Sequence, residues 1–395
     1  RRLPSGKYRI EVKVRGRRRG QSFNTFTAAR DWGRWAEDEL RAGRDPLALP
    51  ELEPEPEEPW TLGRFLPEWR RYRTVGTAHA AKTNSIVKTH IEPYWGSTLL
   101  TDIGWGPIAE WVKILKKGPR ANSTVVSIYN TLSEILATAV LDGRLSENPC
   151  HRHRVAERQD REPYIADDRH LLRQAVLCGE QYRPRRDPPP GEPTHGLVYR
   201  VLVLTAAYTG LRWGEAVGMR RGHRNRNRDL TVDLDQARVI VGPDTVLHEV
   251  GGRVWHEDPK TAAGSRIVSL PPFLVALMRQ VLDLHDYDHV FCGPWGGELR
   301  RGHFRTRVWA PAMAELMPDV PEEDRPTFHS LRSSAEAMLI ADDIPTRAID
   351  IRMGHKIQGA QDRYARIHPD LDQRICDGLE RRYLASSGLR LVRPA

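Results

Sequence analysis

The sequence predicts a multidomain α+β protein: a small sheet-plus-helix unit, an all-helical unit, and a mixed, mostly helical unit with a small antiparallel sheet. Three observations lead to this prediction. The chain has 395 residues, which is long for one domain. Its hydrophobic content of 39% suffices for real cores. An acidic, proline-rich run at 49–59 and an Arg- and His-rich run at 151–163 separate three blocks, and we interpret both runs as linkers.

The first block, 1–48, has the pattern of a β-hairpin followed by a helix. Apolar and charged residues alternate from Tyr8 to Arg15, which is the period of a half-buried strand. Glycines at and beyond Gly16 mark the turn. From about Thr27 onward, Trp, Ala and Leu residues recur at helical spacing, which predicts a helix.

The second block, 60–150, reads as helical throughout. Its first apolar residues recur at helical spacing: Leu62, Phe65, Trp69 and Tyr72. We expect Pro67 to kink or shorten that helix. The clearest helix runs from about Ser123 to Leu141 and ends at Asp142 and the glycine after it. Its single apolar stripe indicates a core helix.

The third block, 164–395, mixes helices with short strands. The segment 182–195 holds five prolines and is expected to be an exposed loop. Apolar residues near the end of the chain, at helical spacing around Ile375, predict a last helix that packs on its own domain or on a neighbouring copy. Four segments have strand character: 237–241, 245–250, 253–257 and 265–270.

The charge balance favours nucleic acid as the partner. Lys and Arg exceed Asp and Glu by 61 − 52 = 9, and no apolar run reaches about 18 residues, so a membrane is not expected. A merely solvated basic surface is the simpler alternative. The four cysteines are scattered without CxxC spacing, which predicts neither a zinc site nor a disulfide framework and fits a reducing cytoplasm. The first twenty residues also lack the apolar core of a signal peptide.

Basic side chains of the first two blocks are the candidates for DNA contact. In the first block they would lie on the open face of the hairpin, although a basic hairpin is often only a solvated edge. In the second block they are expected between the helices, where they could touch phosphates. The candidates are Lys7, Arg9, Lys13, Arg15, Arg17, Arg18, Arg19, Lys82, Lys88, Lys116 and Lys117.

Two pairs in the third block suggest a phosphate clamp. An apolar helix ends at Gly210, a predicted left-handed cap, and is followed by Arg212 and Glu215, three residues apart. Glu215 would support Arg212 in gripping two phosphate oxygens, or the two form only a structural ion pair. His329 and Arg332 have the same spacing, and His329 alone reads equally as a core histidine. Two converging arginines would neutralise the charge that builds on phosphate oxygens in a transition state.

Lys260 is singled out by the rarity of lysine in this chain. There are 9 lysines beside 52 arginines, and only two lysines fall in 164–395. Lysine, with a pKa near ~10.4, can give up a proton to a leaving oxygen, whereas arginine, with a pKa above ~12, cannot. Chance retention is the alternative.

His355 and Tyr364 complete the candidate site. They are nine residues apart, and Gly354 and Gly359 predict a break that lets both face one phosphate. A phenol with a pKa near ~10 needs nearby cations or a base before it can attack. A lone tyrosine at a helix end usually serves packing. Because no carboxylate cluster accompanies these residues, we do not expect a metal-dependent mechanism.

The six residues Arg212, Lys260, His329, Arg332, His355 and Tyr364 stand in the settings TGLRWGE, DPKTAAGSR, FHSLR, MGH and DRYAR. Their order and spacing resemble the tyrosine recombinase (phage-type integrase) family over nearly the whole chain. The resemblance implies an arm-type DNA-binding domain at 1–48, a linker at 49–59, a helical core-binding domain at 60–150, a linker at 151–163 and a catalytic domain at 164–395.

The resemblance also implies a chemistry. Tyr364 would attack the scissile phosphate to give a 3′-phosphotyrosine and a free 5′-hydroxyl, with Lys260 as general acid. The two arginines would clamp the phosphate, His355 would bond a non-bridging oxygen, and His329 would assist proton transfer at the nucleophile. A homotetramer on synapsed double-stranded attachment sites, with possible accessory DNA-bending or directionality factors, is implied as the assembly, in a bacterial-type cytoplasm at the nucleoid.

The sequence departs from the family pattern at two positions. Ser333 stands where many relatives carry histidine, and Asp343 stands where a helix-ending glycine is common. Two other functions stay open: a type IB topoisomerase-like enzyme with nearly the same chemistry, and a non-catalytic DNA-binding regulator on an integrase scaffold.

Overall fold

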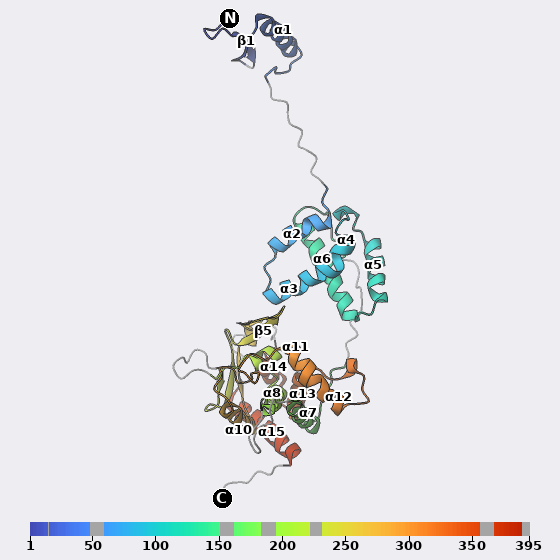
Figure 1. Cartoon of the computed structure of the whole chain (residues 1–395), viewed down its shortest axis with the longest axis vertical. Coiled ribbons are helices and arrows are strands. Elements are labelled where there is room, and N and C mark those ends of the chain that lie inside the picture. Colours follow the sequence, from blue (N-terminus) through green and yellow to red (C-terminus); the bar gives the residue numbers. More distant parts are fainter. Residues whose placement is uncertain are drawn as a thin grey trace. The chain divides into compact units, whose positions relative to one another are not determined.

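The protein is described here as a computed structural model that separates into two compact units, Arg1–Thr61 and Leu62–Ala395 (Figure 1). Both linkers and the proline-rich segment fall almost wholly outside the described residues. So do the side chains of Val14, Arg17, Arg19 and Ala262. The described residues are 1–14, 16–47, 59–150, 162–182, 195–221, 231–355 and 367–388.

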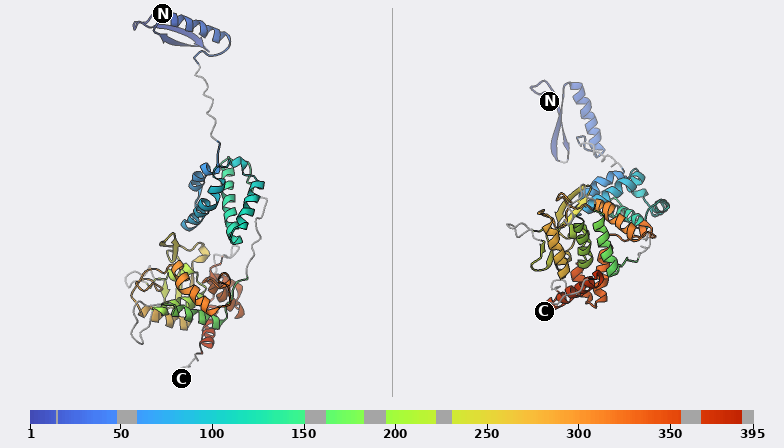
Figure 2. Two further views of the ribbon diagram at one scale, coloured as in Figure 1. Left: turned by 45° about the vertical axis from the view of Figure 1, so that its right-hand side comes forward. Right: turned by 60° about the horizontal axis from the view of Figure 1, so that its bottom comes forward.

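The first unit is a hairpin covered on one face by a helix (Figure 2). Strand β1 (Tyr8–Val14) pairs antiparallel with β2 (Arg17–Phe23), and α1 (Phe26–Arg41) follows. Val12 of β1 and Ala36 of α1 are buried together, which confirms the predicted half-buried strand. The hydroxyl of Thr25 accepts a hydrogen bond from the Ala28 amide and caps α1.

The other face of the hairpin is open and basic. Arg9, Lys13 and Arg18 are exposed there, and Arg9 lies 3.3 Å from the carboxylate of Glu11. Lys7, just before β1, is also exposed. Arg15 lies outside the described residues.

The residues from Leu62 to Leu141 form helices only, as predicted. Eight residues of the longest helix are buried, so its apolar stripe is core. It is also, among the described residues, the one helix whose length and composition would let it cross a membrane. The helices are α2 (Leu62–Tyr72), α3 (Thr77–Ile86), η1 (Val87–Ile91), α4 (Glu92–Trp95), η2 (Leu100–Asp102), α5 (Trp105–Lys117) and α6 (Asn122–Leu141).

The structure differs from the sequence-based expectations for this region in three respects. Pro67 does not shorten α2, because the buried side chains of Phe65 and Trp69 hold the helix on both sides of it. Tyr72 is not part of the apolar face, since 48% of its surface is exposed. The candidate lysines lie on helices rather than between them, all exposed to solvent: Lys82 on α3, Lys88 on η1, and Lys116 and Lys117 at the end of α5.

The remaining described residues combine helices with short strands. The helices are α7 (Asp168–Glu180), α8 (Gly196–Thr209), α9 (Trp213–Val217), η3 (Ala262–Gly264), α10 (Pro272–Asp283), α11 (Arg301–Phe304), η4 (Arg305–Trp309), α12 (Ala310–Leu316), η5 (Glu322–Asp324), α13 (Ser330–Ala341), α14 (Thr346–Met353) and α15 (Pro369–Ser387). The strands are β3 (Val232–Asp233), β4 (Arg238–Val241), β5 (Val246–Val250), β6 (Arg253–Glu257) and β7 (Arg266–Ser269).

The strands do not form one sheet. The order β3-β4-β7 gives a three-stranded antiparallel sheet, and β5 and β6 form a separate hairpin that packs on α9. All four predicted strands are present, but β3 was missed because two residues are too few to show alternation.

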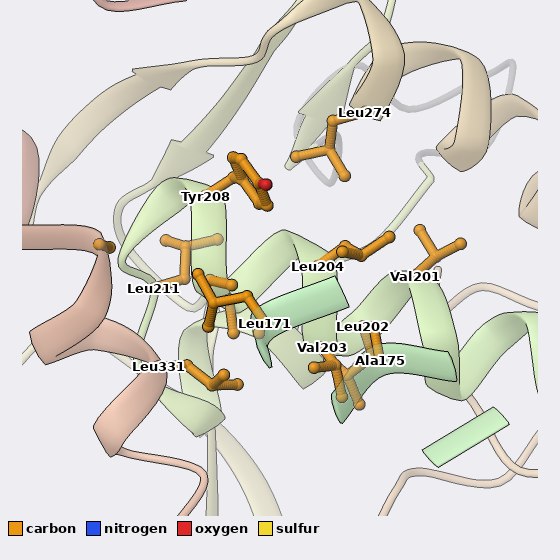
Figure 3. Close-up of a cluster of buried hydrophobic side chains, with 14 of the residues drawn as sticks. Leu171, Ala175, Val201, Leu202, Val203, Leu204, Tyr208, Leu211, Leu274 and Leu331 are labelled. Carbon is orange, nitrogen blue, oxygen red and sulfur yellow. The ribbon is translucent and has the colours of Figure 1, made fainter. Parts of the chain in front are cut away.

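Helix α8 is the centre of the core. It packs against α7, α10 and α13, and eleven of its fourteen residues are buried. Figure 3 shows side chains of α8 between Leu171 of α7, Leu274 of α10 and Leu331 of α13. Because α8 is packed between other helices, its sequence is an almost continuous apolar run.

The last helix packs on its own domain. Helix α15 contacts α7 and α10, and Tyr383 stacks on Phe273 with ring centroids 3.8 Å apart. The described part of the tail, up to residue 388, is therefore held in cis. All four cysteines, Cys150, Cys178, Cys292 and Cys376, are free and buried.

Candidate active site

The bend between α8 and α9 presents Arg212. Gly210 caps α8 with φ 70°, confirming the predicted left-handed residue. A side chain at this position would also displace the end of the Met353 side chain, which packs against Gly210. Arg212 then occupies the N-cap of α9, with its side chain 43% exposed.

Glu215 holds Arg212 in place. Its carboxylate accepts hydrogen bonds from the Arg212 amide at 2.9 Å and from Arg212 Nη1 at 3.0 Å. It is itself buried and bonded by both terminal nitrogens of Arg266, at 3.2 and 2.8 Å. Burial alone would raise the pKa of Glu215, but the hydrogen bonds and charges of Arg266 and Arg212 outweigh it and lower that pKa. Glu215 is therefore a carboxylate that supports two arginines, not one.

Arg332 connects two distant segments beneath the site. It is 5% exposed; Nη1 donates to the carbonyl of Gly210 at 2.7 Å and Nη2 donates to the carbonyl of Met353. Gly210 lies two residues before Arg212, and Met353 lies two residues before His355. Burial, together with the charges of Arg212 and Arg266, lowers the pKa of Arg332 to about 10. Burial is the largest cause of this lowered pKa, and the two neighbouring guanidinium groups add to it.

His329 and Arg212 line the same pocket. It takes the N-cap position of α13, so it and Arg332 come from the same turn, as their spacing predicts. Burial and the charges of Arg332, Arg212 and Arg301 lower the pKa of His329. The imidazole is therefore kept neutral near pH 7 and can accept a proton.

His355 follows α14 through a sharp turn. Gly354 has φ 66° and ends α14, as predicted, whereas Gly359, the second residue of the predicted break, lies outside the described residues. The His355 Nδ1 atom lies 3.1 Å from the Asp350 carboxylate. That contact orients the ring and leaves Nε2 for a ligand, and donation from Nε2 to a phosphate oxygen requires the imidazolium form.

Lys260 lies on the loop between β6 and β7 and is exposed. In the described part of the chain its side chain makes no hydrogen bond or ion pair. The Gly264 amide donates to the Thr261 carbonyl at 2.8 Å, which closes the loop into a compact turn.

A pocket of about 490 Å³ opens next to Arg212 and His329. Three of its lining side chains are neighbouring aromatic rings: Phe304 lies 5.0 Å from Trp213 and 5.8 Å from Phe328, centroid to centroid. Four others are arginines: Arg212, Arg301, Arg305 and Arg325. The pocket therefore combines an aromatic cluster with four cations.

Tyr364 lies outside the described residues, as does Lys356, so the nucleophile remains a sequence prediction. Arg212 and His329 line one pocket. Arg332 connects the segments of Arg212 and His355 through its bonds to the Gly210 and Met353 carbonyls. Within the described ranges, no group of three or more His, Cys, Asp or Glu side chains could hold a metal ion.

Sequence reasoning missed three arginines: Arg266, Arg301 and Arg352. Arg266 was visible in DPKTAAGSR, six residues after Lys260, but a single arginine in a chain with 52 of them gives no signal. Arg352 is 1% exposed and donates to the carbonyl of Ser269 at 2.9 Å. Arg301 acts through space on His329, which sequence spacing cannot show.

Comparison with known proteins finds one matching family. Residues 191–370 match the sequence profile described as the phage integrase family. This stretch of the chain is therefore similar to the phage integrase family. The matched region begins before α8 and ends after Tyr364, so it includes all six predicted residues.

Relatives in the family resemble most of the chain. The phiRv2 prophage integrase of Mycobacterium tuberculosis is 25% identical over 358 residues, covering 89% of this chain and 86% of its own length. The integrase of Mycobacterium phage D29 is 24% identical over 310 residues, covering 75% and 71%.

Solved structures share the fold. The Tn1549 transposon integrase in complex with transposon right end DNA has a TM-score of 0.60 at 15% identity, covering 80% of this chain and 98% of that one. A lambda integrase tetramer bound to a Holliday junction has a TM-score of 0.53 at 18% identity, covering 92% and 93%. Both likenesses support the mixed α/β architecture with small antiparallel sheets.

Proposed function

We propose that the chain is a tyrosine-type site-specific DNA recombinase, which integrates or excises a mobile element by cutting and rejoining strands without a metal ion. One observation carries the proposal. Arg332 bonds the carbonyls of Gly210 and Met353, so segments more than 140 residues apart deliver Arg212, His329 and His355 to one place. Cations of this kind are what a phosphodiester under attack requires.

The residues divide the reaction between them. The phenol oxygen of Tyr364 attacks phosphorus, the bond from phosphorus to the 5′-oxygen breaks, and Lys260 supplies the proton that the leaving oxygen takes up. Arg212 and Arg332 offset the charge on the non-bridging oxygens. Neutral His329 accepts the phenol proton, and protonated His355 donates to a phosphate oxygen. The energy of the broken bond stays in the phosphotyrosine link, so rejoining needs no cofactor.

The assembly and domain roles are further parts of the proposal. The exposed basic face of the β1–β2 hairpin supports an arm-binding role for 1–48, and the exposed lysines of α3, η1 and α5 support a core-binding role for 60–150. The catalytic domain would be 164–395. We propose action as a tetramer on two paired DNA sites in the bacterial cytoplasm, by analogy with the lambda integrase tetramer on a Holliday junction.

A nicked suicide substrate tests the chemistry. DNA carrying the junction sequences that flank the chain's own mobile element is nicked near the cleavage point, so that cleavage releases a short fragment and traps the covalent state. We expect a denaturation-stable protein–DNA adduct with the wild type and none with Tyr364→Phe. An adduct that persists in the Phe variant would show that another residue is the nucleophile.

Two further assays separate the alternatives. Exchange between two sites without general relaxation of supercoiled plasmid supports a recombinase, whereas site-independent relaxation would indicate a topoisomerase. Site binding with no adduct under any condition would indicate a regulator.

Deletion of 1–48 should abolish binding to distal arm sites and leave cleavage of the core site intact.

A further inference from the structure

We infer that Arg266 is a positioning residue that holds the Lys260 loop against the phosphate-binding arginines. The inference rests on the proposed function, because it assumes that Lys260 is the general acid. It adds a residue to which neither the motifs nor the family resemblance gave a role.

Arg266 is too enclosed to touch DNA itself. Its side chain is 3% exposed, as is that of its partner Glu215. The two terminal nitrogens of Arg266 form a fork onto both oxygens of the Glu215 carboxylate, at 3.2 and 2.8 Å. Since Glu215 also holds the amide and Nη1 of Arg212, one carboxylate fixes both arginines.

The same guanidinium holds the loop that carries Lys260. Its Nη1 donates to the carbonyl of Gly264 at 2.9 Å. Gly264 in turn sits on Pro259: a Cβ at Gly264 would come within 2.6 Å of the Pro259 Cβ. Pro259 directly precedes Lys260. Arg266 is therefore linked to the backbone beside the proposed acid through the packing of Gly264 on Pro259.

A third contact ties Arg266 to the turn before His355. Its Nε donates to the carbonyl of Arg352 at 2.7 Å. A Cβ added at Gly354 would come within 3.0 Å of Arg266 Nη1 and within 3.1 Å of the Ala263 carbonyl oxygen, so Gly354 packs against both. Arg266 therefore contacts three separate arms: the Arg212 bend, the Lys260 loop and the His355 turn.

Arginine is required here by its donor geometry. Arg266 makes four hydrogen bonds, one from Nε, two from Nη1 and one from Nη2, out of five available donors. A lysine would keep the charge that Glu215 needs but, with one nitrogen, could not span Glu215, Gly264 and Arg352 together.

The consequence falls chiefly on Lys260. Arg212 keeps its own bonds to Glu215 when Arg266 is changed, and Arg332 keeps its two carbonyls. The Lys260 side chain, in contrast, has no partner among the described residues and takes its position from the loop alone. Loosening the loop should therefore impair proton donation more than phosphate binding.

A substrate with sulfur in place of the 5′-bridging oxygen tests this directly. A thiolate leaves without being protonated, so such a substrate does not need the general acid. Single-turnover adduct formation is measured on oxygen and sulfur substrates for the wild type, Lys260→Ala, Arg266→Lys and Gly264→Ala. Gly264→Ala disturbs the contact with Pro259 but leaves the Arg266–Glu215 pair in place.

We expect Arg266→Lys and Gly264→Ala to slow cleavage of the oxygen substrate by roughly 100-fold, the lower range for loss of a general acid. On the sulfur substrate all three variants should come within about threefold of the wild type, because the remaining cations are intact. The matched control is Arg279→Lys, which alters an exposed arginine paired with Asp235 and should change neither rate.

The outcomes separate the two proposals. Rescue of Lys260→Ala but not of Arg266→Lys or Gly264→Ala by sulfur overturns the positioning role and leaves the proposed function standing. No rescue of Lys260→Ala removes Lys260 as the acid, and the inference falls with it. Thermal unfolding and DNA binding are recorded for each variant, and if Arg266→Lys does not fold, Gly264→Ala decides alone.

Discussion

Arg332 and Lys260 are both cations of the proposed site, but the structure holds them in opposite ways. Arg332 is 5% exposed and bonded to two backbone carbonyls, whereas Lys260 is exposed and is held only through its loop. A clamp built into the core is set before DNA arrives, which avoids reorganisation when charge develops. A proton donor must instead reach the leaving oxygen and exchange its proton with solvent.

This difference determines whether a mutation affects stability, catalysis or both. Changes around Arg332 alter folding and catalysis together, because the same guanidinium joins α8 to α14. Changes of the exposed Lys260 side chain itself alter catalysis with little cost in stability. Variants should therefore differ in how far they lower cleavage and stability, with the strongest effect at Arg332.

Arg332→Ala should reduce adduct formation by about 10³-fold, which is the scale for removing one preorganised donor from a developing anion. It should also destabilise the protein by roughly 2–3 kcal/mol, because the carbonyls of Gly210 and Met353 lose their donor. Suicide-substrate cleavage and denaturant unfolding measure the two effects. Lys260→Ala is the contrast: a similar loss of cleavage at unchanged stability. Equal stability losses in both variants would contradict the division.

Glu215→Gln should cost about 3 kcal/mol of stability, because it leaves the buried Arg266 charge without its carboxylate. The pKa of Glu215 is lowered in the folded protein, so its contribution to stability is present above its ordinary value of 4.5 and is lost as pH falls through the folded value. Unfolding free energy measured from pH 7 downward should therefore fall less steeply for Glu215→Gln. A parallel curve would mean that Glu215 titrates normally.

Arg301→Gln should shift the pH dependence of cleavage. Arg301 is one of the charges that lower the pKa of His329, so its removal raises that pKa. If neutral His329 accepts the phenol proton, the acid limb of the rate profile moves to higher pH in the variant. The measurement is single-turnover cleavage at saturating DNA across pH 5 to 8. Arg305→Gln, which lines the same pocket, is the matched control and should leave the limb unmoved.

Asp343→Gly should have the smallest effect, a gain of roughly 0.5–1 kcal/mol. Asp343 follows α13 with φ 54°, a conformation that costs most residues free energy and glycine almost none. Asp343→Ala should lose about 1 kcal/mol for the same reason. Thermal unfolding compares the two, and cleavage should stay constant in both. A destabilised glycine variant would show that the aspartate side chain has a structural role of its own.

The sequence predicted the elements of this molecule well where periodicity was strong. The helix of residues 122–141, the β1 alternation and the caps at Gly210 and Gly354 are all present. Even the departure at Asp343 was informative, since the position does take the left-handed conformation that glycine would favour. Local sequence encodes these features because they depend on neighbours within a few residues.

The network beneath the site could not be predicted. Arg266 reaches Glu215 across 51 residues and Arg352 across 86, and Arg332 reaches Gly210 across 122. No local pattern distinguishes an arginine that donates to buried carbonyls from one that faces water. The continuation of α2 past Pro67 has the same origin, because burial on both sides of the proline outweighed its tendency to end a helix.

The burial of every native cysteine has a practical consequence. Burial raises the pKa of all four thiols, which disfavours the thiolate that alkylating reagents and oxidants attack. A cysteine introduced at an exposed site, such as Lys117→Cys at the end of α5, would then be the one fast-reacting sulfur. A fluorophore could be attached there without replacing any native cysteine, and its emission would report changes in the surroundings of α5.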